Sequence, residues 1–140
     1  MKFNIVFDIK KGPWGGGNQF LRALKEELIL KKHYQDKIEN ADIILFNSHH
    51  NLNQIIRLKH QYPNKIFIHR IDGPIFSIRD KDLMIDKFIF RVNKMITDGT
   101  VFQSVYSYNK SESLGLNIFN KKKIIINAPS RNFKVLKKKL

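Results

Sequence analysis

The sequence predicts an α/β domain built on an open parallel sheet of about five strands, with helices on both faces. Short apolar segments rich in β-branched residues alternate along the chain with amphipathic segments of helical spacing. This alternation is typical of βαβ crossovers, which join parallel strands. A glycine-rich run, Gly12-Pro-Trp-Gly-Gly-Gly-Asn-Gln19, stands between the first apolar segment and the first helical one. Open α/β sheets place their ligand crevice at such a bend.

Each expected element has a local signal. Asn18 is a candidate N-cap of the first helix, and the helix at 80–95 is expected to bury one apolar stripe. That stripe consists of Ile85, Phe88, Ile89 and Val92. The strands are expected at residues 3–9, 42–47, 65–69, within 96–103, and at 123–127. The helices are expected at 18–32, 51–62, 80–95 and 105–114.

One element of a doubly wound sheet is missing from the pattern. Residues 33–41 hold no apolar run at the point where such a sheet usually has its second strand. We therefore expect this strand to be lost or very short. Residues 1–128 are expected to form a single domain, and residues 129–140 a polar, basic tail.

Composition sets further limits. The 140 residues, 42% of them apolar, suffice for one domain with a real core. The chain has no cysteine, which excludes disulfides, zinc–thiolate sites and thiol nucleophiles. No apolar run approaches the roughly 20 residues that cross a bilayer, and the N-terminal apolar stretch resembles a strand more than a signal peptide. We expect a cytoplasmic protein, with peripheral contact at the inner membrane face as an open alternative.

The formal net charge of +14 favours anionic partners, namely nucleotide-sugar phosphates, acidic lipid surfaces or nucleic acid. Drift toward lysine in an A/T-rich genome explains the same charge without any partner. Nucleic acid is disfavoured, because the aromatic residues fall at positions predicted to be core and offer no stacking platform. These residues are Phe67, Phe76, Phe88, Phe90 and Phe102.

The glycine-rich run has a functional and a structural interpretation. Backbone N–H groups of Gly15, Gly16 and Gly17, at the start of a helix, suit a diphosphate or acceptor phosphate. The alternative is a tight turn that lets strand and helix pack. Trp14 either stacks on a sugar ring or covers the edge of the core.

Polar residues follow the later strands at the same predicted edge of the sheet. Asp72 is the first candidate for a catalytic base and His69 the second. A turn-forming Asp and a structural histidine are the competing interpretations. Arg70 is a candidate partner for a phosphate or a neighbouring carboxylate. The remaining candidates for substrate binding are Asn18, Ser48, His49, Gln103 and Ser104, the last with helix capping as its alternative.

Several chemistries are disfavoured. His49 and His50 have no carboxylate at ligand spacing, so we expect no metal site. The chain lacks the Gly-x-Ser-x-Gly elbow of the α/β-hydrolases and the Gly-Lys-Ser/Thr end of a phosphate-binding loop. A dinucleotide fingerprint is also absent, because the glycines do not match G-x-G-x-x-G.

Four segments in order resemble the N-terminal, Rossmann-like domain of a glycosyltransferase of the two-Rossmann (GT-B) type, close to family 4. They cover nearly the whole chain. The segments are Gly12-Pro-Trp-Gly-Gly-Gly-Asn-Gln-Phe20, Ala41-Asp-Ile-Ile-Leu-Phe-Asn47, His69-Arg-Ile-Asp-Gly-Pro74, and Thr97-Asp-Gly-Thr-Val-Phe-Gln-Ser104 with Ile124-Ile-Ile-Asn-Ala-Pro129.

The resemblance implies an acceptor-side domain that transfers a sugar from a nucleotide-sugar to a glycan or lipid-linked acceptor, with no cofactor. No residue here matches the family's Glu-containing donor motif, so a separate donor-binding domain is expected as a partner. The alternative is a non-catalytic remnant that binds an acceptor, a membrane surface or a partner subunit.

Overall fold

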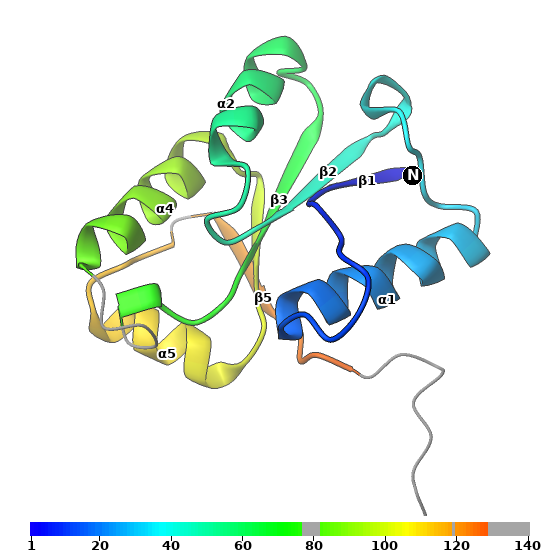
Figure 1. Ribbon diagram of the computed structural model, residues 1–140. Coiled ribbons are helices and arrows are strands. Elements are labelled where there is room, and N and C mark those ends of the chain that lie inside the picture. Colours follow the sequence, from blue (N-terminus) through cyan, green and yellow to red (C-terminus); the bar gives the residue numbers. More distant parts are fainter. Residues whose placement is uncertain (77–81, 119, 129–140) are drawn as a thin grey trace, which may run out of the picture.

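The computed structural model describes residues 1–76, 82–118 and 120–128. In this part of the chain five parallel strands form one sheet in the order β1-β2-β3-β4-β5 (Figure 1). The predicted class, a Rossmann-like α/β fold, is confirmed. The strands are β1 (Phe3–Val6), β2 (Ile43–Asn47), β3 (Ile66–Ile71), β4 (Gly99–Phe102) and β5 (Lys121–Ile124). The helices are α1 (Gly16–Leu30), α2 (Leu52–Gln61), α4 (Leu83–Ile96) and α5 (Val105–Ser113), with a short 3-10 turn, η1 (Ile38–Asn40).

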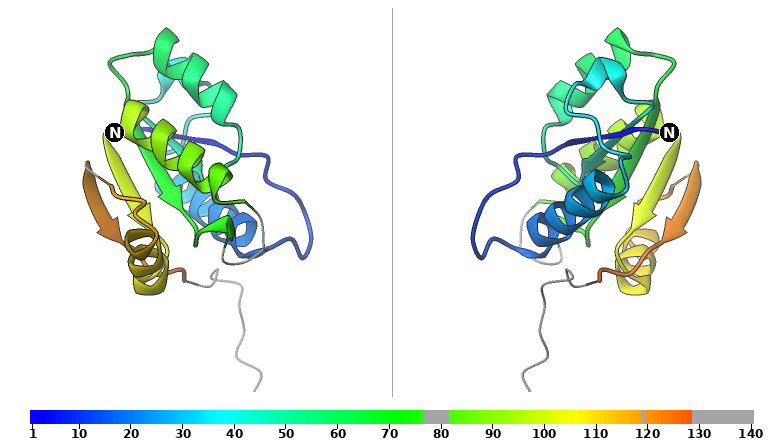
Figure 2. Two further views of the ribbon diagram at one scale, coloured as in Figure 1. Left: turned by 90° about the vertical axis from the view of Figure 1, so that its left-hand side faces the viewer. Right: turned by 90° about the vertical axis from the view of Figure 1, so that its right-hand side faces the viewer.

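Helices pack on both faces of the sheet, as predicted. On one face α1 packs through Leu21 against Ile5 and Leu45. On the other face α2 and α4 cover Phe46 and Phe67 in the larger apolar cluster. The two side views show this division, with α2 and α4 in front of the sheet in one and α1 in front in the other (Figure 2). Every residue of β2 is buried, as expected for a central strand between two helical layers.

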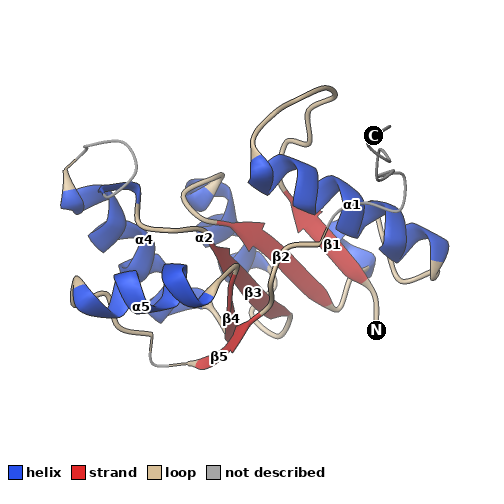
Figure 3. Ribbon diagram, turned by 90° about the horizontal axis from the view of Figure 1, so that it is seen from below, coloured by secondary structure: helices blue, strands red, loops and turns tan. Residues whose placement is uncertain are grey.

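The second strand of a doubly wound sheet is reduced here to a single β-bridge. Tyr34 makes an isolated parallel bridge with Phe3. The Phe3 N–H donates to the His33 carbonyl at 2.7 Å, and the Gln35 N–H donates to the Phe3 carbonyl at 2.8 Å. Tyr34 and β2 therefore flank β1 on opposite sides. The chain reverses its direction across the sheet here, which creates a topological switch point between β1 and β2. Figure 3 shows α1 on one side of the strands and α4 and α5 on the other.

Three expectations about the elements need correction. Asn18 lies inside the first turn of α1, and Gly15 occupies its N-cap position without a side-chain cap. In α4, Ile89 and Val92 are buried, whereas Ile85 and Phe88 of the predicted stripe are 38% and 48% exposed. Phe76 is also 41% exposed. The basic tail predicted at 129–140 lies outside the described residues. None of the described helices combines the length and apolar character that crossing a bilayer requires.

Candidate functional site

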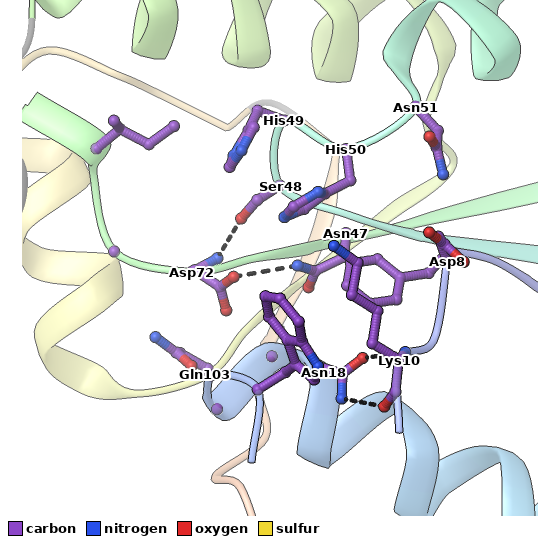
Figure 4. Close-up of a pocket in the computed structure, with 17 residues that line it drawn as sticks. Asp8, Lys10, Asn18, Asn47, Ser48, His49, His50, Asn51, Asp72 and Gln103 are labelled. Carbon is purple, nitrogen blue, oxygen red and sulfur yellow. Dashed lines mark hydrogen bonds between the residues drawn. The ribbon is translucent and has the colours of Figure 1, made fainter. Parts of the chain in front are cut away.

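A cleft of about 670 Å³ opens along the carboxyl edge of the sheet at this switch point (Figure 4). Segments that follow each of the first four strands contribute to its walls. The glycine-rich bend forms one wall, and the loops after β2 and β3 form the other. The residues that line it are Phe7, Asp8, Lys10, Trp14, Gly15, Gly16, Gly17, Asn18, Asn47, Ser48, His49, His50, Asn51, Asp72, Gly73, Ile75 and Gln103.

The first turn of α1 holds the glycine-rich bend in place. The Asn18 side chain accepts from the Lys10 N–H at 2.8 Å and donates to the Lys10 carbonyl at 3.0 Å. The Gln19 amide donates to the carbonyls of Gly12 and Trp14. These four bonds tie the loop to the helix that follows it. Asn18 was predicted to bind substrate, but its amide is occupied in shaping the loop.

One of the three glycines lies close to the polar groups of the other wall. A β-carbon at Gly17 would lie 3.4 Å from Asp72 Oδ2 and from Asn47 Nδ2. The start of α1 therefore packs directly against polar groups from the ends of β2 and β3. At Gly15 and Gly16 a β-carbon would meet nothing within 4 Å. These two glycines leave the backbone open toward the cleft instead of serving packing.

The start of α1 makes this wall favourable for anions. No side chain caps the N-terminus of the helix, and Gly15, Gly16 and Gly17, which form this N-terminus at the positive end of the helix dipole, line the cleft. Lys10 adds a formal charge, and its Nζ lies 4.3 Å from the centre of the Trp14 ring. Trp14 is 52% exposed. This wall thus combines a cation, a helix N-terminus and an aromatic surface.

Arg70, at the end of β3, lies beneath the cleft and is almost completely buried. Its guanidinium donates to Asn47 Oδ1 at 2.6 Å and to Asp72 Oδ1 at 2.5 Å through Nη1. Through Nη2 it donates at 3.0 Å to both Gln103 Oε1 and Asn127 Oδ1. The group also stacks 4.5 Å above the ring of Phe20 in α1. Arg70 was a candidate for phosphate or carboxylate pairing. It pairs with Asp72 and does not line the cleft.

Asp72 lies in the cleft wall, and its side chain is 27% exposed. Oδ1 accepts from Arg70, and Oδ2 accepts from Asn47 Nδ2 at 3.1 Å, as Figure 4 shows. The Asp72 N–H donates to Ser48 Oγ at 2.9 Å. These contacts fix the position of the carboxylate. Its role as a catalytic base stays a prediction, and its geometry also suits a positioning residue.

Ser48 is held in an uncommon conformation at the end of β2. Its φ of 43° lies in the left-handed region, which costs a residue other than glycine about 1–3 kcal/mol. Three contacts hold it there: its N–H donates to the Arg70 carbonyl, its Oγ accepts from Asp72, and its carbonyl meets His69 Nε2. This turn directs His49 and His50 to the cleft, where their rings lie 4.1 Å apart.

His69 lies inside the protein and not in the cleft. It is fully buried, stacked at 4.2 Å on Phe46. Since the Ser48 carbonyl can only accept, Nε2 carries the proton and donates to it at 2.9 Å. Nδ1 then accepts from Asn93 Nδ2 at 3.1 Å. The geometry agrees with a structural histidine, the alternative interpretation, and gives the side chain no contact with a ligand in the cleft.

The two candidates after β4 have different positions. Gln103 lines the cleft and bonds Arg70 and Asn127. Ser104 caps α5, accepting from the Ser107 N–H at 3.0 Å, and does not line the cleft. Sequence reasoning missed other lining residues. Asp8 and Lys10 follow β1 at the crevice edge, so the same edge rule that selected Asp72 would have found them.

Within the described residues no group of three or more His, Asp or Glu side chains is arranged to hold a metal ion. Comparisons with models of protein families, with curated proteins and with solved structures each found no match. The geometry of the cleft and the chemistry of its residues therefore carry the functional argument.

Replacing Arg70 is predicted to destabilise the fold strongly. Arg70→Met leaves Asp72 Oδ1 without its donor, takes one of two donors from Gln103 Oε1, and removes the link between β2, β3, β4 and the segment after β5. Breaking a buried pair typically costs about 3–5 kcal/mol. We expect a loss near the lower value, about 3 kcal/mol, because Asp72 retains some contact with water. Urea unfolding measures it, with the exposed Arg91→Met as control. A loss below about 1 kcal/mol would contradict this role.

Stability is predicted to depend on His69 below neutral pH. Burial lowers the pKa of His69 from 6.5 to about 4, because the imidazolium would lose its hydration, while the bond to the Ser48 carbonyl and the charge of Asp72 partly oppose the shift. Between these values the unfolded chain binds a proton that the folded chain does not. The free energy of unfolding therefore falls as pH drops from 6.5 to 4, by about 3 kcal/mol.

Denaturant titrations across this range, on the wild type and on His69→Gln, isolate that contribution. The variant removes the titrating group, so its curve is expected to be flatter by the same amount. Equal slopes for both proteins would show that a protonated His69 is tolerated in the fold.

Proposed function

We propose that this chain is the acceptor-side domain of a sugar-transferring enzyme related in design to the family 4 glycosyltransferases. The reaction moves a sugar from a nucleotide-sugar to a hydroxyl group of a glycan or lipid-linked acceptor. A second, Rossmann-like domain or protein supplies most of the donor site. A cytoplasmic location, in contact with the inner membrane face where the acceptor is lipid-linked, suits a soluble nucleotide-sugar donor.

The proposal rests on one observation above all. The triple-glycine bend and the Asp72-Gly73 bend line the same cleft at the switch point of the sheet. At Gly17 the first turn of α1 lies close to Asp72 and Asn47. An anion-favouring wall thus faces a wall of hydrogen-bonding side chains, as transfer from a diphosphate to a hydroxyl group requires.

The cleft residues suit distinct parts of this reaction. The N–H groups at the start of α1, with Lys10, suit a phosphate group of the donor or acceptor. Ser48 Oγ accepts from the Asp72 N–H and keeps a hydroxyl hydrogen to donate to a sugar oxygen. Asp72 either takes the proton of the acceptor hydroxyl or positions that hydroxyl through Asn47. Trp14 offers a flat apolar face to a sugar ring.

A second candidate is a binding module without catalysis. It is favoured by two observations: both oxygens of Asp72 already accept bonds within the protein, and His69 is buried. On this account the cleft holds a saccharide or its phosphate, and no proton transfer occurs in this domain.

Transfer assays distinguish the two candidates. The chain is incubated with a panel of nucleotide-sugars and saccharide acceptors, with and without the product of the adjacent gene. The enzyme proposal expects transfer only in the presence of a donor-binding partner. Asp72→Asn, if it remains folded, should then reduce turnover at least about tenfold. Unchanged turnover would remove Asp72 from the mechanism, and binding without any transfer would favour the module.

Gly16→Ala is predicted to raise the stability of the fold and to weaken ligand binding. Its β-carbon meets nothing in the fold, and alanine stabilises a helix relative to glycine by up to about 1 kcal/mol. The same methyl group keeps a ligand farther from the backbone of the anion-favouring wall, so a phosphate-bearing ligand should bind several-fold more weakly. Trp14 is the only tryptophan in the chain, so its fluorescence reports titration of UDP-glucose into the cleft. Equal affinities for variant and wild type would place the ligand elsewhere.

A further inference from the structure

A second hollow of about 550 Å³ continues from the cleft between α2 and α4. His49 and Asn51 line both hollows and so mark where they meet. Asn51 precedes α2 with a left-handed φ of 57°, in the same turn that begins at Ser48. The second hollow therefore adjoins the cleft at these two residues. We name it the α2–α4 groove.

The composition of the α2–α4 groove suits a saccharide. Phe88 is 48% exposed and lies beside Ile85 on one side, although its spacing predicted a core position. From α2, Asn53, Gln54 and Arg57 line the other side. A pyranose ring has C–H groups on its faces and hydroxyls at its rim, so it matches an aromatic surface flanked by planar hydrogen-bonding groups. An acyl chain would leave these polar groups without partners.

Charge narrows the class of saccharide. Among the described residues that line the groove none is acidic, whereas Asp8 and Asp72 line the cleft. Arg57 presents a guanidinium, whose fork matches a carboxylate in two parallel hydrogen bonds. The strongly basic chain adds a favourable field for an anionic ligand. The groove thus favours a sugar that carries a carboxylate over a neutral one.

We propose that the α2–α4 groove is an extended acceptor subsite that binds an acidic sugar of an oligosaccharide whose terminal sugar occupies the cleft. Phe88 stacks on this second sugar, and Arg57 pairs with its carboxylate. This inference rests on the proposed function, because it assumes that the cleft takes a saccharide. It makes the acceptor an anionic glycan chain.

Binding of defined oligosaccharides tests the proposal. The probes are di- and tetrasaccharides of hyaluronan, which contain glucuronic acid, and of chitin, which are neutral. Fluorescence of Trp14 reports occupation of the cleft, and amide chemical shifts of α2 and α4 report occupation of the groove. The hyaluronan tetrasaccharide is expected to bind at least tenfold more tightly than its disaccharide and to shift the amides of both helices.

Matched variants assign that gain to the groove. Phe88→Ala should abolish the tetrasaccharide gain, and Met95→Ala, an exposed apolar residue of α4 that does not line the groove, should not. Arg57→Gln should make the affinities for the hyaluronan and chitin tetrasaccharides equal, while substitution of the exposed Lys87, Lys87→Gln, should leave them different. Thermal melts verify that each variant is folded.

Three results would overturn the proposal. The first is equal affinity of di- and tetrasaccharides with a response from Trp14, which leaves the proposed function intact. The second is the absence of any Trp14 response to saccharides, which removes the proposed function as well. The third is binding of a dodecyl glycoside that depends on Phe88 and is tighter than binding of the hyaluronan tetrasaccharide. This result would assign the groove to a lipid chain.

Discussion

The buried guanidinium of Arg70 is the interaction on which the candidate site depends. It joins Asn47 at the end of β2, Asp72 after β3, Gln103 after β4 and Asn127 after β5 through four hydrogen bonds. Each parallel strand is followed by a different loop at its carboxyl end. The hydrogen bonds between the strands do not fix the positions of these loops relative to one another. A charged group with several donors in one plane does so here. Its burial requires Asp72 as counter-charge, which explains why that carboxylate stands fixed in the cleft wall.

The position of the cleft follows from the path of the chain. The reduced second strand, a single bridge at Tyr34, still carries the chain past the outer edge of β1 before it turns to β2. The loops after β1 and β2 therefore leave the sheet in opposite directions and open a space between them. At Gly17 the start of α1 lies close to the polar ends of β2 and β3. The sheet has lost most of one strand and has kept the geometry that makes a ligand site.

Periodicity and edge rules predicted the fold and the rim of the cleft, but not the contacts inside it. Most strands and helices were predictable because their apolar spacing is local, but β5 lies at Lys121–Ile124 and only overlaps the apolar run predicted at 123–127. His69 and Arg70 are adjacent in sequence, and the alternation of a strand sends them to opposite faces of the sheet. Only the three-dimensional packing shows that one meets Asn93 and the other Asp72. Phe88 followed the helical stripe and is still half exposed, because the spacing does not reveal which turns of a helix its neighbours cover.

The central claim is that the triple-glycine bend and the Asp72 loop together bind one ligand. The most direct measurement is a backbone amide chemical-shift map of the chain titrated with a nucleotide-sugar and an oligosaccharide acceptor. The account predicts that the largest shifts cluster at Gly15–Gly17, Ser48–His50 and Asp72–Gly73, from three separate loops at one edge of the sheet. Shifts confined to the lysine-bearing surface of α5 and β5, at Lys110 and Lys121–Lys123, would instead indicate nonspecific attraction to anions and would contradict it.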